Sequence, residues 1–384
     1  MVQYVSTMGK ISFEEESTYG TDPATTRDFL GILTSFSHNI NKNPQPIRGI
    51  GSRNIRQLSH LGTDVELTME IQVQNIHWLY MFLGGGSLAS PSEADSLPSF
   101  TFEATLDSTT DISNVYTGTV ITSISLAVSE DDLITVSMSA RAQDAFVYDA
   151  AQVSHASVDT DAVAAFYNAT LFSKGIIGTI ATSEDNDEYV GTGDGTTASF
   201  YSNHVPKSSP TPEIWVDGTA QGVTLGTIED PEDADITTGK CYWNTSTGEI
   251  TFKSTEIPSA DEIITCAYEF DYEEISAKTK SITLDMNNNN EPTRGIGTED
   301  IRQLPPKGRD YTGSCSFYKQ DADQVNWVTK FQNDLTLKLV LVIAGTTYNL
   351  VLDDVGFGTH AEAWSEADII MEDMSFTGTS LSVS

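Results

Sequence analysis

The stretch PIRGIGSRNIRQL at residues 46–58 returns later in the chain as PTRGIGTEDIRQL at residues 292–304. Nine of the thirteen positions are identical, whereas two unrelated windows of this length share about one at ordinary residue frequencies. A second matching pair follows in the same order, AVSEDDLITVSMS at 127–139 and AWSEADIIMEDMS at 363–375. Because two separate segments recur in the same order, the repeated unit is a domain and not a single peptide.

An alternation of apolar and polar residues follows each copy of the motif. In the first copy it has the period of a β-strand with one buried face, and its apolar members are Val65, Leu67, Met69, Ile71 and Val73. The second copy keeps the period at Tyr311, Cys315 and Phe317, which gives Cys315 the inward position held by Met69. We therefore expect Cys315 to be a buried, unreactive thiol.

A short helix is expected after this strand in each copy. Residues 76–83 place apolar side chains on one helical face, with Asn75 as the N-cap and Gly84 as the stop. Residues 325–331 repeat the pattern. The remaining apolar segments alternate with the period of strands. The chain is therefore predicted to be all-β, and each copy to be a β-sandwich module or half-barrel with one short helix.

Residues 188–272 differ in texture from both copies and are typical of a separate, small β-domain. Turn signals such as GDG at 193–195 divide them into short strand candidates. This segment is expected to be an insert in a loop of the second module, where insertions are tolerated. The predicted domains are a first module at residues 1–150, a second module at residues 151–187 and 273–384, and the insert at residues 188–272.

The chain is strongly acidic, with 55 Asp and Glu against 20 Lys and Arg and a formal charge of -35 at pH 7. Nucleic-acid binding needs Lys and Arg to neutralise phosphates, so this charge argues against a DNA-binding protein and for a surface that lets DNA pass. The same acidity is typical of proteins adapted to very high salt, where self-repulsion is screened within about 3 Å at 1 M. The sequence is compatible with both explanations.

Arginine is concentrated where the repeat is. Six of the eight Arg residues in the chain lie in or just after the two motif copies. Arg suits bidentate pairing with carboxylates at interfaces, and carboxylates are abundant elsewhere in this chain. We expect contacts between modules or subunits to involve Arg48, Arg56, Arg294 and Arg302. The alternative is that these side chains brace the loop of their own module, whose shape the motif glycines set.

No catalytic or metal-binding signature is found. The sequence contains no HExxH, GxSxG or P-loop pattern, and its three Cys residues are too scattered for a disulfide framework. The acidic run at 229–235 lacks the Gly and the final Glu of an EF-hand, so a solvated loop is expected there. No enzymatic activity, cofactor or metal is predicted. The N-terminus has no secretory pattern, and no apolar run of about 18 residues predicts a membrane span.

Together these segments resemble the major tail tube proteins of long-tailed, siphovirus-like viruses, particularly those that infect halophilic archaea. The resemblance is carried by ESTYGTDPATT at 16–26, the RGIG…IRQL motif, the alternating strand, the short Trp-bearing helix and SEDDLITVSMS at 129–139. It covers nearly the whole chain except the insert. It implies β-sandwich modules whose sheets join those of their neighbours into a hollow ring of six modules, and rings that stack into the tube that conducts the genome.

Two modules per chain would let three chains form a pseudo-sixfold ring, a homotrimer. The resemblance implies further copies of the chain, other tail proteins and the tape-measure protein as partners, with viral DNA passing through without specific binding. It implies a location in the virion tail after assembly in the host cytoplasm, and an insert similar to the immunoglobulin-like domains that decorate tail exteriors.

Two alternatives stay open. One is another tail component that shares the module, such as a distal tail or terminator ring. The other is an acidic cell-surface β-protein, which the missing export signal disfavours.

Overall fold

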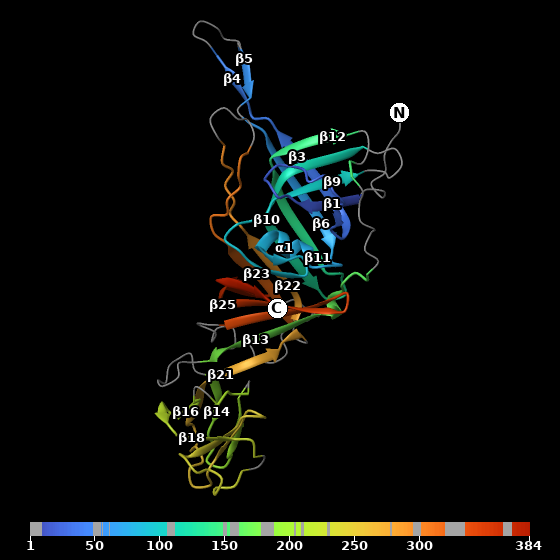
Figure 1. The fold of residues 1–384 in the computed structure, drawn as a ribbon. Coiled ribbons are helices and arrows are strands. Elements are labelled where there is room, and N and C mark those ends of the chain that lie inside the picture. Colours follow the sequence, from blue (N-terminus) through green and yellow to red (C-terminus); the bar gives the residue numbers. More distant parts are fainter. Residues whose placement is uncertain are drawn as a thin grey trace.

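The computed structural model describes residues 10–48, 55, 57–60, 62–105, 112–148, 152–153, 161–177, 188–202, 205–208, 211–228, 231–276, 279–294, 301–318, 335–363 and 371–384. Most of these residues form strands, and one α-helix, α1 (His77–Leu83), lies among them. The expected all-β class with two tandem modules is confirmed. In Figure 1 the first module, the second module and a smaller third unit follow one another along an elongated molecule.

The first module is sandwich-like, and one long strand, β10 (Ser113–Ser129), belongs to both of its layers. The first half of β10 pairs with β9 and β12, and its second half pairs with β11. The strand orders are β2-β1-β9-β10-β12 in one layer and β3-β6-β11-β10 in the other. The remaining strands are β1 (Lys10–Glu15), β2 (Asp28–Phe29), β3 (Ile32–Asn41), β6 (Asp64–Gln72), β9 (Phe100–Thr105), β11 (Thr135–Ala142) and β12 (Asp144–Tyr148).

The core of the first module follows the predicted alternation. The apolar residues of β6 are buried, and their polar neighbours lie on the opposite face of the sheet. Helix α1 buries its side chains from Trp78 to Leu83, and the Oδ1 of Asn75 accepts a hydrogen bond from the backbone N–H of His77 at 3.2 Å. It ends at Gly84 in a left-handed conformation that favours glycine, with φ 81°. The first predicted helix is confirmed, but its N-cap is Ile76 and not Asn75. The second, at 325–331, lies outside the described residues.

The second module repeats this arrangement strand for strand. Its layers have the orders β21-β13-β24-β25-β27 and β22-β23-β26-β25. Cys315 is buried opposite Met374, as Met69 is opposite Met138, so its predicted inward position is confirmed. Burial also raises the pKa of its thiol. The strands are β13 (Ala169–Ile177), β21 (Ile263–Glu274), β22 (Thr279–Asn287), β23 (Asp310–Tyr318), β24 (Leu335–Ile343), β25 (Thr346–Ala363), β26 (Met371–Gly378) and β27 (Ser380–Val383).

The third unit hangs from β21. The first half of this strand pairs with β14 and β16 of the small unit, and its second half pairs with β13 of the second module. The unit therefore fills the connection between β13 and β21, where the first module has the short connection between β1 and β2. Trp243 and Tyr268 pack edge to face in its core, 5.1 Å apart. Its other strands are β14 (Glu188–Thr192), β15 (Ser199–Tyr201), β16 (Glu213–Val216), β17 (Thr219–Ala220), β18 (Val223–Gly226), β19 (Cys241–Asn244) and β20 (Glu249–Phe252).

Buried carboxylates fix the ESTYGTDPATT segment between β1 and β2. Glu16 accepts hydrogen bonds from the hydroxyls of Ser99 and Thr101 and from the backbone N–H of Gly118. Further along the chain Arg27 is fully buried and pairs with Glu103, which is equally buried. A buried charge of this kind is tolerated because it is paired. These contacts tie the connection to β9 and β10 of the first module.

Two extended arms leave the sandwich layers. In the first module β4 (Pro44–Ile47) pairs with β5 (Gln57–His60), and this hairpin projects from the top of the molecule in Figure 1. In the second module Thr293 bridges Gln303, which matches the pairing of Ile47 with Gln57 in the first. The described ends of the repeated motif thus pair with each other in both modules, and we call these paired segments the arms. A smaller hairpin, β7 (Gly84–Ser87) with β8 (Ser90–Glu93), follows α1.

Within the described part of the chain, no helix is long and apolar enough to cross a membrane. The same residues contain no group of three or more His, Cys, Asp or Glu side chains arranged to hold a metal ion.

Replacing residues 178–267 with a two-residue Asn-Gly turn should leave the two modules folded. Ile177 and Tyr268 are directly paired in antiparallel strands, so a tight turn can join them. We expect soluble protein whose melting temperature, followed by circular dichroism, falls by only a few degrees through the loss of the packing on Tyr268. Insoluble protein would show instead that the third unit is part of the module core.

Candidate assembly surfaces

The two modules are joined edge to edge by a strand pair. The second half of β10 pairs antiparallel with β22 over seven residue pairs, from Ser123 with Asn287 to Ser129 with Ser281. One continuous sheet with the order β3-β6-β11-β10-β22-β23-β26-β25 results. We call the β10–β22 pairing the seam. It joins the last strand of one four-stranded layer to the first strand of the same layer in the next module.

Asn288, directly after β22, fastens one end of the seam. Its side chain is fully buried and donates hydrogen bonds to the carbonyl oxygens of Phe82 at 3.0 Å and Ile121 at 3.3 Å. Its Oδ1 accepts a hydrogen bond from the Nε of Arg309 at 3.0 Å. Because both ends of the amide are satisfied, the group is buried without an unpaired polar atom.

Arg309 and Tyr311 extend this contact to α1 and β8. The guanidinium of Arg309 donates to the carbonyl oxygens of Leu83 at 2.9 Å and Ala94 at 2.6 Å. The hydroxyl of Tyr311 donates to the carboxylate of Glu93. A cation on the last carbonyl of a helix is also favoured by the helix dipole. We refer to Asn288, Arg309 and Tyr311 as the staple.

The arm of the second module packs on the first module. Ile301 is 0% exposed and Leu304 is 5% exposed, and both pack against Val120. Tyr19 and Leu97 of the first module complete this small apolar cluster. The Ile and Leu of the repeated motif are therefore buried by a neighbouring module and not by their own.

An ion pair accompanies this cluster. The guanidinium of Arg294 donates to the carboxylate of Asp64 at the start of β6 and to the carbonyl oxygen of Thr63 at 3.2 Å. Asp64 also accepts a hydrogen bond from the side chain of Asn43 at 3.0 Å. The carboxylate is thus held in place by its own module before the neighbouring arm reaches it.

The counterparts of these residues in the first arm and the second module make no such contacts with the described residues. Counterparts are 246 positions apart around the motif (292 minus 46). Ile55 and Leu58, the counterparts of Ile301 and Leu304, are 48% and 59% exposed. Arg48, the counterpart of Arg294, is exposed and has no ion pair with a described residue. Asp310 accepts a hydrogen bond from Asn289 at 2.7 Å, as Asp64 does from Asn43.

The four expected interface arginines have different surroundings. Arg294 crosses between the modules, and Arg48 is exposed at the end of β4. Arg302 is exposed, and its backbone N–H donates to the carbonyl oxygen of Thr293. Arg56 lies outside the described residues. The apolar pair Ile301 and Leu304 is not among the residues predicted from the sequence, although both belong to the identical positions of the motif.

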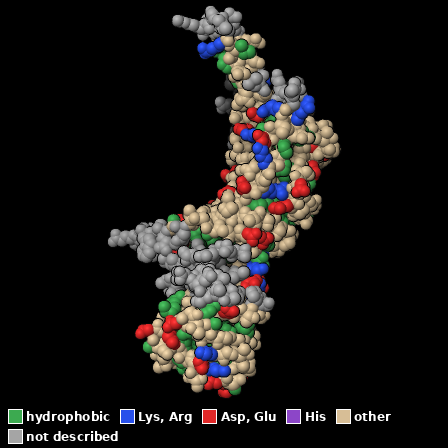
Figure 2. Space-filling model, turned by 90° about the vertical axis from the view of Figure 1, so that its left-hand side faces the viewer, with side chains coloured by type: hydrophobic (Ala, Val, Ile, Leu, Met, Phe, Trp, Pro, Cys, Tyr) green, Lys and Arg blue, Asp and Glu red, His purple; other side chains and the backbone are tan. Residues whose placement is uncertain are grey.

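The face of the eight-stranded sheet that points away from the core is polar. It carries hydroxyl and amide side chains with a few carboxylates, and a hollow of about 290 Å³ lies on it. Arg141 on this face pairs with Glu66 at 3.3 Å. Figure 2 shows that Lys and Arg side chains gather on the upper part of the face it displays. The polar residues that line the hollow are Thr68, Ser123, Ser125, Ser137, Ser139, Asp285, Asn287 and Thr312.

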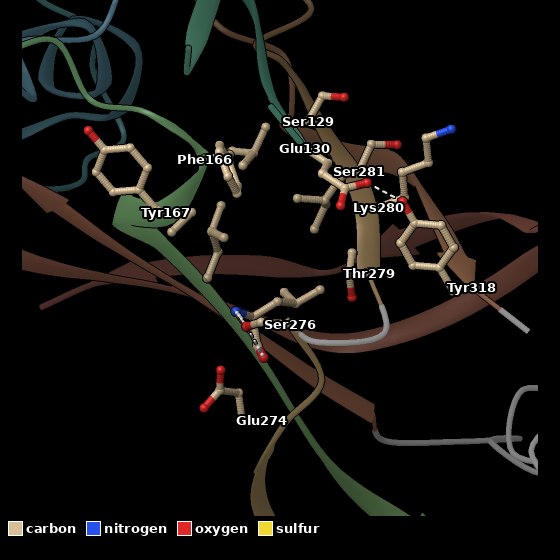
Figure 3. A pocket seen from close by; sticks show the side chains of 15 residues that line it. Ser129, Glu130, Phe166, Tyr167, Glu274, Ser276, Thr279, Lys280, Ser281 and Tyr318 are labelled. Carbon is tan, nitrogen blue, oxygen red and sulfur yellow. Dashed lines mark hydrogen bonds between the residues drawn. The ribbon is translucent and has the colours of Figure 1, made fainter. Parts of the chain in front are cut away.

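A pocket of about 390 Å³ lies at the other end of the seam, between the two modules. Figure 3 shows its polar rim, where Glu130 accepts a hydrogen bond from the hydroxyl of Tyr318. Glu274 and Lys280 also line the pocket, at a distance from each other. Its floor is apolar, with side chains such as Ile282. No His or Cys, the usual general base and nucleophile, is among the residues that line it.

The model of one protein family, described as phage tail tube protein, matches residues 7–229 and again residues 216–378. The chain belongs to the phage tail tube protein family. Each of the two matches contains one copy of the repeated motif, and the two overlap at residues 216–229, within the third unit. A search among curated proteins found no match. This tail tube protein is accordingly a structural component of the virion tail, a class defined by self-assembly and not by catalysis.

Removing the staple should destabilise this tail tube protein. Arg309→Ala deletes three hydrogen bonds and leaves the Ala94 carbonyl and the Asn288 Oδ1 without their donor, which should lower the free energy of unfolding by about 1–3 kcal/mol. Chemical denaturation measures the change. Lys307→Ala, which breaks an exposed pair with Glu291, is the control and should change stability by less than about 1 kcal/mol. Equal effects of the two substitutions would contradict the assigned role of Arg309.

Proposed function

We propose that three copies of this tail tube protein close a ring of six modules and that such rings stack into the tube through which the viral genome passes. The seam carries this proposal, because it joins two copies of one module and leaves the matching edges, β3 and the end of β25, paired on one side only among the described strands. A unit whose two edges fit each other assembles head to tail and closes when the rotation permits.

The seam also supplies a residue-level register for ring closure. Counterparts of β10 lie 236 positions later in β25 (363 minus 127), and counterparts of β22 lie 246 positions earlier in β3. The pair Ser123 with Asn287 therefore translates into Thr359 of one copy with Asn41 of the next. Both Thr359 and Asn41 are exposed in the single chain. Backbone hydrogen bonds along this edge would extend the sheet without interruption.

Three chains with eight strands each would give a barrel of twenty-four strands, and barrels of such size enclose an aqueous channel. The polar face of the sheet would line this channel, since the opposite face is covered by α1 and the other layers. The third unit hangs from β21, in the outer layer, and would decorate the exterior. Hydroxyl groups and carboxylates predominate on this wall, and the charge of Arg141 is already paired with Glu66, which suits passage of DNA without binding.

Electron microscopy of the purified protein tests the assembly. Stacked rings with three-fold symmetry and a central channel are expected. Rings that never stack would favour the alternative assignments, a distal tail or terminator ring, and a protein that stays monomeric at all concentrations would contradict the proposed ring.

Cysteine pairs test the register. In a Thr359→Cys/Asn41→Cys chain the two thiols should meet across the joint between copies, so mild oxidation should give covalent dimers and trimers on a non-reducing gel. The native cysteines are buried and should not interfere. In the control chain Thr359→Cys/Ser37→Cys the two positions would lie roughly 13 Å apart, too far for a disulfide. Cross-linking of the control but not of the test pair would refute this register.

We further propose a long-tailed virus of a high-salt host, on the basis of the formal charge of -35. Self-repulsion of that size destabilises a compact chain at low ionic strength and is screened by salt. The melting temperature should therefore rise steadily between about 0.1 M and 2 M KCl, whereas sucrose of equal osmolality should have a smaller effect. A melting temperature that is independent of KCl would indicate that the acidity serves the channel wall and not adaptation to salt.

A further inference from the structure

We infer that the first hairpin arm, residues 44–60, is a latch that docks sideways onto the second module of a second copy of this chain. The inference rests on the proposed ring and assigns a role within it to the repeated motif. The second module of one chain would thus bind the first arm of a second copy. This contact between chains would repeat the contact that the second arm makes with the first module within one chain.

The exposure of the repeated residues carries the inference. Ile301 and Leu304 are 0% and 5% exposed because they lie on the first module, whereas Ile55 and Leu58 are 48% and 59% exposed. The residue types, their spacing and the pairing of the arm are the same in both copies. What differs is that a module precedes the second arm within the chain. A second copy of the chain supplies the corresponding module to the first arm.

The receiving surface has room for the latch. The seat of Ile301 is Val120 on β10, and the counterpart of Val120 on β25 is Gly356, as their pairing with Arg141 and Thr377 shows. A side-chain carbon added at Gly356 would meet no atom within 4 Å. The space above this position is therefore open in the single chain, where an apolar side chain of a neighbouring arm can enter.

Charge complementarity also favours docking of the first arm on the second module. Arg294 of the second arm binds Asp64, and the counterparts of these two residues are Arg48 and Asp310. Asn289 already holds the Asp310 carboxylate in the way that Asn43 holds Asp64. The first arm, residues 44–60, contains three Arg and no Asp or Glu in an otherwise acidic chain. Its attraction to acidic surfaces of another copy would speed docking as well as fix its position.

The seam and the latch act at one joint. Within the chain, the second arm follows β22 and lies beside the start of β6. With Thr359 opposite Asn41, the first arm would follow β3 of one copy and lie beside the start of β23 of the other copy in the same way. Strand pairing alone can slip along its length, because backbone groups are the same at each position. An apolar pair and an ion pair outside the sheet would select one register.

The experiment compares assembly with folding. Ile55→Asn/Leu58→Asn changes only exposed side chains, so the melting temperature of the monomer should be unchanged, while the concentration needed for ring formation, measured by analytical ultracentrifugation, should rise on the order of a hundredfold. Ile228→Asn/Val205→Asn, which alters similarly exposed residues of the third unit, is the matched control and should assemble like the unchanged chain.

A charge exchange tests the pairing itself. Arg48→Asp and Asp310→Arg should each impair ring formation, and the chain that carries both substitutions should regain it, because every joint would again bring opposite charges together. Normal rings from the Ile55→Asn/Leu58→Asn chain, or no recovery in the double charge exchange, would overturn the latch. If the unchanged protein forms no ring at all, the proposed ring fails and not the latch alone.

Discussion

The pairing of β10 with β22 is the constraint on which the rest of the molecule depends. It is possible because β10 changes layers part-way along its length, which frees its second half to serve as an edge. The change occurs near Gly118, whose φ of 62° is left-handed and whose N–H is held by Glu16. A Cβ at this position would lie 2.7 Å from that of Gln143. The strand can therefore cross between layers only with glycine there.

Much of this architecture could be predicted from the repeat and its alternation, but the contacts of the motif could not. Arg294 finds Asp64 about 230 residues earlier, a pairing that no local pattern contains. Ile55 and Ile301 have the same local sequence context and opposite exposure, because burial is decided by the neighbouring module. The predicted end of the insert, at residue 272, falls within β21, a single strand that pairs with the third unit and with the second module. The sequence does not show where the strand changes partners, because its hydrophobic alternation continues across that point.

The two kinds of joint in the proposed ring would share geometry but not chemistry. The staple residues Asn288, Arg309 and Tyr311 belong to the joint within the chain, and their counterparts in the first module are Lys42, Thr63 and Val65. Val65 has no polar side-chain atom and Lys42 has no acceptor, so these three cannot repeat the staple, in which Asn288 also accepts from Arg309 and Tyr311 donates to Glu93. The joint between chains would therefore rely on the strand pairing, the apolar residues of the arm and one ion pair, and would be the weaker of the two.

A difference in strength between the two joints would help to control when the ring assembles. Each association costs translational and rotational freedom, and joining modules in pairs within one chain removes that cost for half of the joints in a ring. Because the covalent link already holds one joint together, the other can be weak enough to stay open in the single chain and still close when copies are concentrated. Duplication also lets the copies diverge, since an insert carried by one module appears three times around a ring of six, which leaves space between neighbouring inserts.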